Sequence, residues 1–181
     1  MNIGVLSAIL AFIPALIANP LAVIFGGGTP IDGGLKIHGK RILGDGKTWR
    51  GLLGGGLAGG LVTIAFNFLV SPFINIFPQS MRTYIIIFAL SFGALFGDMM
   101  ASFLKRRLGR KRGAKTPVID QYDFVIGAFL LTFIVDHNWV LKTYFSGDGW
   151  IALIILLIGI PLLHRIVNII GYKLGLKNEP W

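Results

Sequence analysis

Five long apolar stretches dominate the hydrophobic pattern of the chain, and short polar segments separate them. Each stretch has about the 20 residues that a helix needs to cross the hydrocarbon core of a bilayer. Backbone groups in lipid must be hydrogen-bonded internally and no strand-like alternation competes, so each stretch is predicted to be helical. The pattern predicts an all-α polytopic membrane protein in which residues 1–181 form a single membrane domain. The predicted spans are residues 3–25, 52–70, 84–104, 122–139 and 150–171.

The first predicted span contains residues that disturb a helix. Pro14 and Pro20 lack a backbone N–H, and each restricts the residue before it. A kink or break is therefore expected near Pro14 or at the Asn19-Pro20 pair. Irregular backbone at membrane depth is tolerated where protein or a water-filled cavity covers it. Asn19 therefore either lines a polar, substrate-binding site or marks a simple helix end.

Charged residues are scarce and unevenly placed. Only 14% of the residues are charged, whereas a soluble domain has about a quarter. Of the 17 basic residues, only Arg82 and Lys142 lie outside segments 26–51 and 105–119 and the C-terminal end. Lys and Arg concentrate on the cytoplasmic side of membrane proteins. Segments 26–51 and 105–119 are therefore predicted to be functional cytoplasmic loops of a multi-pass cell-membrane protein, with the N-terminus outside and the C-terminus inside.

Composition narrows the expected partners and chemistry. A net charge of +9 also occurs in nucleic-acid-binding proteins, but the positive-inside bias alone is enough to make a membrane protein basic. We therefore expect a membrane partner and no nucleic acid. The chain has no cysteine, which excludes disulfides, thiolate nucleophiles and iron–sulfur clusters.

The first predicted cytoplasmic loop has the residues of a phosphate cradle just ahead of a helix. Glycines let the backbone approach an anion, and the free N–H groups of a helix N-terminus favour negative charge. The segment is not a P-loop, because Arg41 stands where that motif needs glycine. The candidate substrate-binding residues of this cradle are Gly44, Gly46, Lys47 and Arg50.

The position of Asp98 is informative because acids are few. It lies nearly two turns inside the cytoplasmic end of the third predicted span. An ionisable group at that depth is costly unless it is paired or bound to a cation, so Asp98 is a candidate functional residue. Ser102 and Lys105 share its helix face. The alternative is a structural ion pair of Asp98 within its helix or with another helix, for example with Lys105 or Arg106.

Asp120 and Asp123 form a second acidic pair at the start of the fourth predicted span, on one side of its first turn. Together with Asp98 they would supply the hard oxygen ligands that suit Mg²⁺. Asp120 could instead be only a helix cap. Lys105 and Arg106 can face a substrate phosphate, whereas the other basic residues of the second loop suit an anchor to anionic lipid. Metal, cations and an anion-binding loop at one membrane face favour phosphoryl or nucleotidyl transfer.

Four motifs, taken together, resemble the archaeal CDP-archaeol synthases, relatives of the CDP-diacylglycerol synthases. The likeness covers about residues 19–128, and the order and spacing make it specific. The His-Gly-Gly and Asp-Arg elements of the bacterial and eukaryotic enzymes have no match, and His38 stands where many relatives have an acid. The motifs are Pro30-Ile-Asp-Gly-Gly34, Arg41-Ile-Leu-Gly-Asp-Gly-Lys-Thr-Trp-Arg-Gly51, Gly97-Asp98 through Ser102-Phe-Leu-Lys-Arg-Arg107, and Asp120-Gln-Tyr-Asp-Phe124.

The resemblance implies transfer of CMP from CTP to 2,3-bis-O-geranylgeranylglycerol 1-phosphate, an isoprenoid glycerol phosphate lipid, with Mg²⁺ and release of pyrophosphate. The lipid phosphate oxygen would attack the α-phosphorus of CTP, so no side-chain nucleophile is needed. The implied metal ligands are Asp98, Asp120 and Asp123, and the implied phosphate-binding residues are Lys47, Arg50, Lys105 and Arg106. The resemblance also implies substrate-binding roles for Asn19, Asp32, Gly44, Asp45, Gly46, Thr48 and Ser102.

Two other functions fit parts of the sequence. A membrane glycerol-phosphate acyltransferase would also have basic, glycine-rich inner loops, but it would not need three acids at one face. A small ion or solute carrier would place Asp98 on an ion path. Such a path should continue through polar residues to the outer face, and Thr63 and Asn67 offer only a weak continuation.

The distribution of basic residues gives a topological prediction. Reporters fused near Lys40 and at the C-terminus should both read as cytoplasmic, because the basic segments stay on that side of the membrane. Protease protection of the same fusions in vesicles checks the result. An external signal at either point would overturn both the orientation and the cytoplasmic placement of the candidate site.

Overall fold

The computed structural model describes residues 4–78, 80–110 and 116–176, and it confirms an all-α membrane fold. The part of the chain it describes contains five helical spans long and apolar enough to cross a membrane. Ile3 of the first predicted span, residues 111–115 of the second predicted loop and residues 177–181 lie outside the described residues. The spans are Val5–Ile24, Trp49–Val70, Met81–Arg107, Ile119–Tyr144 and Gly149–Lys173.

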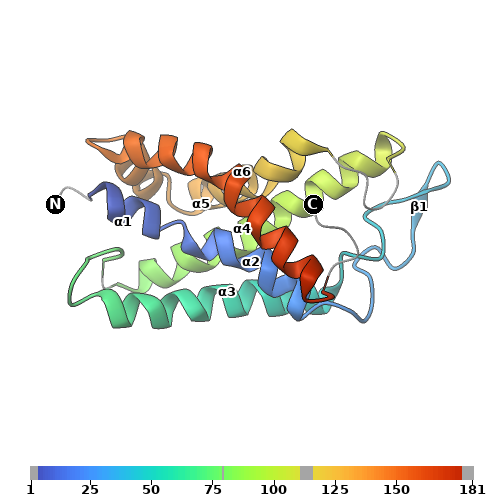
Figure 1. Cartoon of the computed structure of the whole chain (residues 1–181), viewed down its shortest axis with the longest axis horizontal. Coiled ribbons are helices and arrows are strands. Elements are labelled where there is room, and N and C mark those ends of the chain that lie inside the picture. The colour runs from blue at the N-terminus through green and yellow to red at the C-terminus, as the bar shows by residue number, and fades with distance from the viewer. Residues whose placement is uncertain (1–3, 79, 111–115, 177–181) are drawn as a thin grey trace.

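Six helices and one short hairpin build these spans and their connections (Figure 1). The hairpin is antiparallel, with Lys36 opposite Arg41. The elements in chain order are α1 (Val5–Leu10), α2 (Ile13–Ile24), β1 (Lys36–Ile37), β2 (Lys40–Arg41), α3 (Trp49–Val70), α4 (Met81–Arg107), α5 (Pro117–Tyr144) and α6 (Gly149–Lys173).

The first span is two helices, α1 and α2, which meet at Phe12. Pro14 occupies the first turn of α2, where a missing N–H costs nothing, so the break expected near Pro14 is confirmed. No break occurs at Asn19-Pro20, because α2 continues through Pro20. Neighbouring helices make such a proline tolerable in a membrane by covering the backbone groups that it frees.

Small residues let α3 approach its neighbours closely. Gly55 faces Ala22 of α2, and Gly60 lies under the ring of Phe88 of α4. A Cβ atom at either glycine would collide with those atoms. Transmembrane helices gain no hydrophobic energy from leaving lipid, so this close packing is what associates them.

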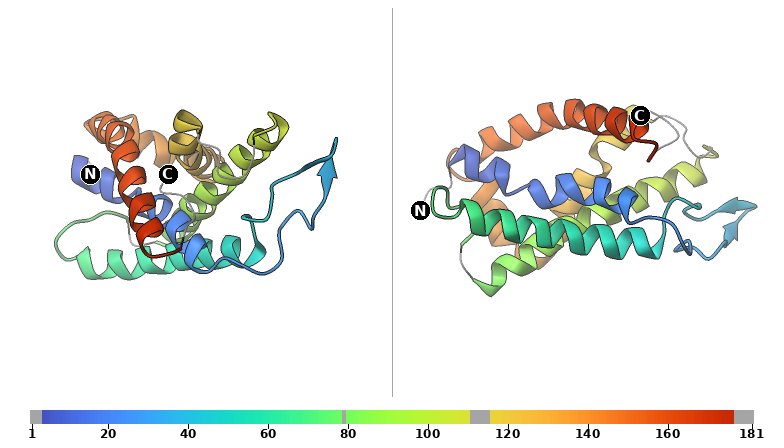
Figure 2. Two further views of the ribbon diagram at one scale, coloured as in Figure 1. Left: turned by 45° about the vertical axis from the view of Figure 1, so that its right-hand side comes forward. Right: turned by 60° about the horizontal axis from the view of Figure 1, so that its bottom comes forward.

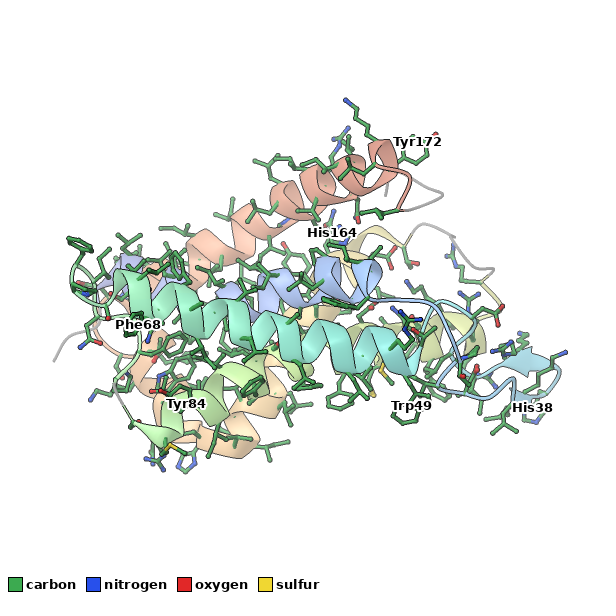
Figure 3. All side chains as sticks on the ribbon, turned by 90° about the horizontal axis from the view of Figure 1, so that it is seen from below. His38, Trp49, Phe68, Tyr84, His164 and Tyr172 are labelled. Carbon is green, nitrogen blue, oxygen red and sulfur yellow. The ribbon has the colours of Figure 1, made fainter. Side chains whose placement is uncertain are left out.

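The connections predicted to be cytoplasmic lie together at one end of the bundle. Figures 1 and 2 show the β1–β2 hairpin, the end of α4 and the start of α5 there, with the start of α1 at the opposite end. Figure 3 shows His38 at the tip of the hairpin and Trp49 at the start of α3. His38 has a positive φ of 51°, so it forms the turn of the hairpin.

At the opposite end, Asp136 interrupts α5 with non-helical backbone angles. Its carboxylate accepts a hydrogen bond from the N–H of Trp139 at 3.0 Å and pairs with Nε of Arg82 at 2.9 Å. The fourth span was predicted to end at residue 139, but the helix starts again after Asp136, which caps it, and continues to Tyr144. The hydroxyl of the fully buried Tyr144 then donates to the carbonyl of Ala8 at 3.1 Å.

This arrangement predicts unequal roles for the two partners of the Arg82–Asp136 pair. Asp136→Ala should lower the free energy of unfolding by about 2 kcal/mol, because a buried cap is lost. Arg82→Gln should cost less than about 1 kcal/mol, since that side chain is 70% exposed. Thermal unfolding in detergent compares the variants, and equal losses would contradict the capping role of Asp136.

Candidate functional site

The closest approach of α4 and α5 brings two of the predicted acids together. A Cβ atom on Gly97 would collide with the backbone oxygen of Asp123, and one on Gly127 would collide with the backbone of Gly97. Asp98, the next residue after Gly97, is close enough to Asp123 for their charges to interact. The two carboxylates therefore lie within electrostatic range of each other because both helices carry glycine at the crossing.

Two lysines pair with acids around this crossing. Lys47, from the loop before α3, forms an ion pair with Asp98. Lys105 on α4 pairs with Asp120 on α5 at 2.5 Å. Asp98 is thus in an ion pair, as the structural alternative held, although its partner is Lys47 of the loop before α3 and not Lys105 or Arg106.

Asp120 is turned toward the first turn of its own helix. Its Oδ2 accepts a hydrogen bond from the backbone N–H of Thr116 at 2.8 Å, while Oδ1 binds Lys105. Thr116 is the N-cap of α5, so Asp120 supports the helix start without being the cap itself. In residues 4–78, 80–110 and 116–176 there is no group of three acids or histidines close enough to hold a metal ion.

The carboxylates of Asp98 and Asp123 still suit Mg²⁺. This ion is commonly bound by one or two carboxylates, with substrate phosphate oxygens and waters completing its six positions. The side chains of Asp98 and Lys47 are 29% and 23% exposed, so an ion and a phosphate can reach them. Of the predicted ligand set, Asp98 pairs with Lys47 and Asp120 with Lys105, whereas Asp123 forms no ion pair with the described side chains.

Asp32 organises the first loop. Its carboxylate binds Arg41 through Nη2 at 2.6 Å and accepts hydrogen bonds from the backbone N–H groups of Leu43 at 2.9 Å and Gly44 at 3.0 Å. The Arg41 guanidinium, helped by these N–H groups, holds the pKa of Asp32 well below its usual range, although burial opposes this. Asp45 also binds Arg41, at 2.6 Å, but its side chain is 63% exposed.

Backbone contacts join the two ends of this loop and thereby position Lys47. The N–H of Ile31 donates to the carbonyl of Lys47 at 2.8 Å, and Pro30 bridges to Thr48. Thr48 is the N-cap of α3, where its hydroxyl accepts from the N–H of Gly51 at 3.1 Å. Thr48 is therefore buried as a structural element, and Lys47 next to it is directed at Asp98.

The other predicted residues lie on α2, α3 and α4. Arg50 is exposed on the first turn of α3, and its side chain passes over Gly28. Ser102 is buried on α4, and the Oδ1 atom of Asn19 on α2 is buried with no partner among the described residues. Arg106 forms no ion pair with the three acids, and it lines a cavity together with Gly44 and Asp45 of the first loop, two other predicted substrate-binding residues.

Sequence reasoning missed a contact that holds the hairpin against α4. Arg107 donates to the carbonyls of Ile37 at 3.0 Å, Lys40 at 3.1 Å and Arg41 at 2.7 Å. In the sequence, Arg107 is one of several basic residues in a row, and nothing nearby separates it from a membrane anchor. Only the fold shows that it fixes the loop that carries Lys47.

Comparison with known proteins decides the family. The family model described as CarS-like CDP-archaeol synthase matches residues 1–181. The chain belongs to this CDP-archaeol synthase family. Similar relatives named CDP-archaeol synthase occur in Halorubrum lacusprofundi (45% identity, covering 98% of this chain and 97% of the relative) and in Methanocorpusculum labreanum (49% identity, covering 93% and 99%).

A solved structure supports the same assignment. It is described as an intramembrane enzyme for archaeal membrane lipid biosynthesis and matches with a TM-score of 0.66 at 32% identity, covering 96% of each chain. The protein is therefore a multi-pass membrane transferase with CDP-archaeol synthase activity in archaeal lipid biosynthesis. This assignment replaces the acyltransferase and carrier alternatives.

The role of Asp32 gives a prediction for the loop. Asp32→Asn should increase the rate of trypsin cleavage within residues 36–50 by about tenfold or more, because Arg41 loses its buried partner and the loop opens more often. Limited proteolysis in detergent measures this rate. Asp45→Asn is the matched control and should change it little, since Asp45 is mostly exposed.

The pKa of Asp32 sets the pH range of this protection. A carboxyl whose pKa is lowered on folding contributes its full stabilisation above its ordinary pKa and loses it as the pH falls through the folded-state pKa. The parent loop should therefore be as resistant at about pH 5 as at pH 7. Strong cleavage of the parent at the lower pH would contradict the role of the Asp32–Arg41 pair.

Proposed function

We propose that the protein transfers CMP from CTP to 2,3-bis-O-geranylgeranylglycerol 1-phosphate, with Mg²⁺, at the cytoplasmic face of the membrane. The observation that carries the proposal is the pair of carboxylates at the α4–α5 crossing, Asp98 and Asp123, with Lys47 and Lys105 beside it. The two carboxylates can bind the metal ion of a metal–nucleotide substrate, and the two ammonium groups can bind its phosphate groups.

The basic residues of the site have distinct tasks in this proposal. Lys47 lies against Asp98, so its ammonium can donate to a phosphate oxygen held at that carboxylate. Lys105, fixed by Asp120, provides a second donor on the other side. Arg50 is exposed on the first turn of α3, so its guanidinium can bind the terminal phosphate groups of CTP, which leave as pyrophosphate.

The acids would bind and orient the nucleotide through Mg²⁺. The ion, when bound, polarises the α-phosphorus and neutralises charge on the leaving pyrophosphate. Asp98 and Asp123 are its proposed ligands. Asp120, the third residue of the predicted set, positions Lys105. The lipid phosphate is the attacking group, so the chain needs only to align its oxygen with the α-phosphorus.

The loop between α2 and α3 would shape the nucleotide site. Gly44 and Gly46 leave its backbone open to phosphate, while Asp32, Asp45 and Thr48 maintain its fold through the contacts described above. Asn19 and Ser102, both on helices that border this end of the bundle, are the proposed polar contacts for the rest of the substrate. The basic loops favour a cytoplasmic location for this end.

Replacing each acid by asparagine tests the mechanism. Asp98→Asn and Asp123→Asn should each lower CMP transfer by at least about 10³-fold and raise the Mg²⁺ concentration needed, because asparagine keeps the size but removes a charged ligand. Incorporation of labelled CTP into lipid, measured across a Mg²⁺ titration, gives both quantities. Metal-independent transfer by the parent protein would refute the proposal.

Asp120→Asn separates positioning from metal binding. If Asp120 holds Lys105, the variant should raise the KM for CTP by about tenfold while its Mg²⁺ requirement stays that of the parent. A shift in the Mg²⁺ requirement as large as that of Asp98→Asn would make Asp120 a ligand instead. Thermal unfolding in detergent, run beside the assay, shows that each variant is folded.

A further inference from the structure

A tyrosine of α5 supplies a hydrogen-bond donor that α6 lacks. Pro161 lies inside α6 and has no backbone N–H, so the carbonyl of Leu157, four residues earlier, loses its helical partner. The hydroxyl of Tyr122 donates to that carbonyl at 2.8 Å. Leu157 lies within a membrane span, where no water can replace the missing donor. The bond therefore satisfies a backbone group that the proline sets free.

The helix that receives this bond, α6, is the least enclosed of the five spans. It packs mainly against α1 and α5, and only 17% of its apolar window is buried, against 44% for the span of α5. Helices in lipid gain no hydrophobic energy from each other, so packing and interhelical hydrogen bonds hold them together. Because the packing is sparse, the Tyr122–Leu157 bond is a large part of what fixes α6 against the start of α5.

Tyr122 is next to Asp123 in the chain but faces a different helix. Successive residues are about 100° apart around a helix, so Tyr122 meets α6 while the backbone of Asp123 lies against Gly97 of α4. Asp123 forms no ion pair with the described side chains, and its carboxylate accepts a hydrogen bond from the N–H of the neighbouring Phe124 at 2.6 Å. The backbone at the start of α5 therefore determines where this carboxylate lies.

We propose that Tyr122 is a positioning residue for the transfer reaction, an inference that rests on the role proposed above for Asp123. By binding the Leu157 carbonyl, its hydroxyl holds the start of α5 between α4 and α6 and keeps the Asp123 carboxylate beside Asp98. A shift of about 1 Å in a group that orients a substrate can lower a rate by about 10²-fold. Tyr122 therefore affects the reaction without touching the nucleotide.

A purely structural role for Tyr122 makes a different prediction, and Pro161 separates the two roles. In Pro161→Ala the new N–H of residue 161 satisfies the Leu157 carbonyl, and a carbonyl oxygen can accept a second hydrogen bond, so the Tyr122 bond remains. In the double variant Tyr122→Phe/Pro161→Ala the carbonyl is satisfied, but the bond between the helices is gone. The cost of an unsatisfied carbonyl is thus measured apart from the loss of position.

The test compares these three variants with the parent as full-length proteins in detergent. Tyr172→Phe is the matched control, because Tyr172 lies near the end of the same helix and is 48% exposed (Figure 3). Hydrogen exchange of the backbone of residues 119–125 is measured without metal or substrate, beside the temperature of thermal unfolding. The Mg²⁺ concentration that gives half-maximal CMP transfer is measured with labelled CTP.

The expected results differ between the variants. Tyr122→Phe should lower the unfolding temperature and should raise both the exchange rate and the Mg²⁺ requirement by about tenfold. The double variant should recover the unfolding temperature but keep the fast exchange and the raised Mg²⁺ requirement. Pro161→Ala and Tyr172→Phe should match the parent in exchange rate and in Mg²⁺ requirement.

Recovery of all three properties in the double variant would overturn the proposal, because Tyr122 would then only satisfy the carbonyl. Parent-like exchange in Tyr122→Phe would overturn it as well, and so would fast exchange with an unchanged Mg²⁺ requirement, since Asp123 would keep its place without the bond. Metal-independent transfer by the parent would refute the proposed Mg²⁺ site. Exchange needs no metal, so it decides separately whether Tyr122 fixes the start of α5.

Discussion

The candidate site depends on how closely the backbones of α4 and α5 can approach. Gly97 and Gly127 leave no room between the two helices for even one Cβ atom, and dense packing of this kind is the main force that associates helices in lipid. The approach places Asp98 beside Asp123, two charges that would repel each other with no cation near. Lys47 and Lys105 lie within electrostatic reach of Asp123 and reduce that repulsion.

Lys47 is held near Asp98 by a loop that is fixed at several points. Asp32 closes the loop around Arg41, and Arg107 fastens the hairpin to the end of α4. The same α4 carries Asp98, so one helix positions both the acid and the loop that supplies Lys47. Hydrogen bonds to charged groups hold this arrangement, and they are stronger than those between neutral groups.

The sequence predicted the features that depend on composition and spacing alone. Five apolar stretches gave the five spans, and the scarcity of acids made Asp98, Asp120 and Asp123 stand out. Features that depend on contact between distant segments could not be found in this way. The Asp98–Lys47 pair joins residues 51 positions apart, and the Asp136–Arg82 pair joins two different helices, although an acid inside an apolar span was a signal available to find Asp136.

Charge balance at this end of the bundle explains why the proposed substrates fit together. Asp98 and Asp120 each have a lysine partner, whereas Asp123 forms no ion pair with the described side chains. A few residues further along the chain, Arg106 and Arg110 form no ion pair with a carboxylate that the structure describes. One region therefore has a carboxylate in excess and its neighbour has cations in excess. A divalent cation satisfies the first and phosphate groups satisfy the second, so a metal–polyphosphate bound across them would leave fewer uncompensated charges than the free protein has.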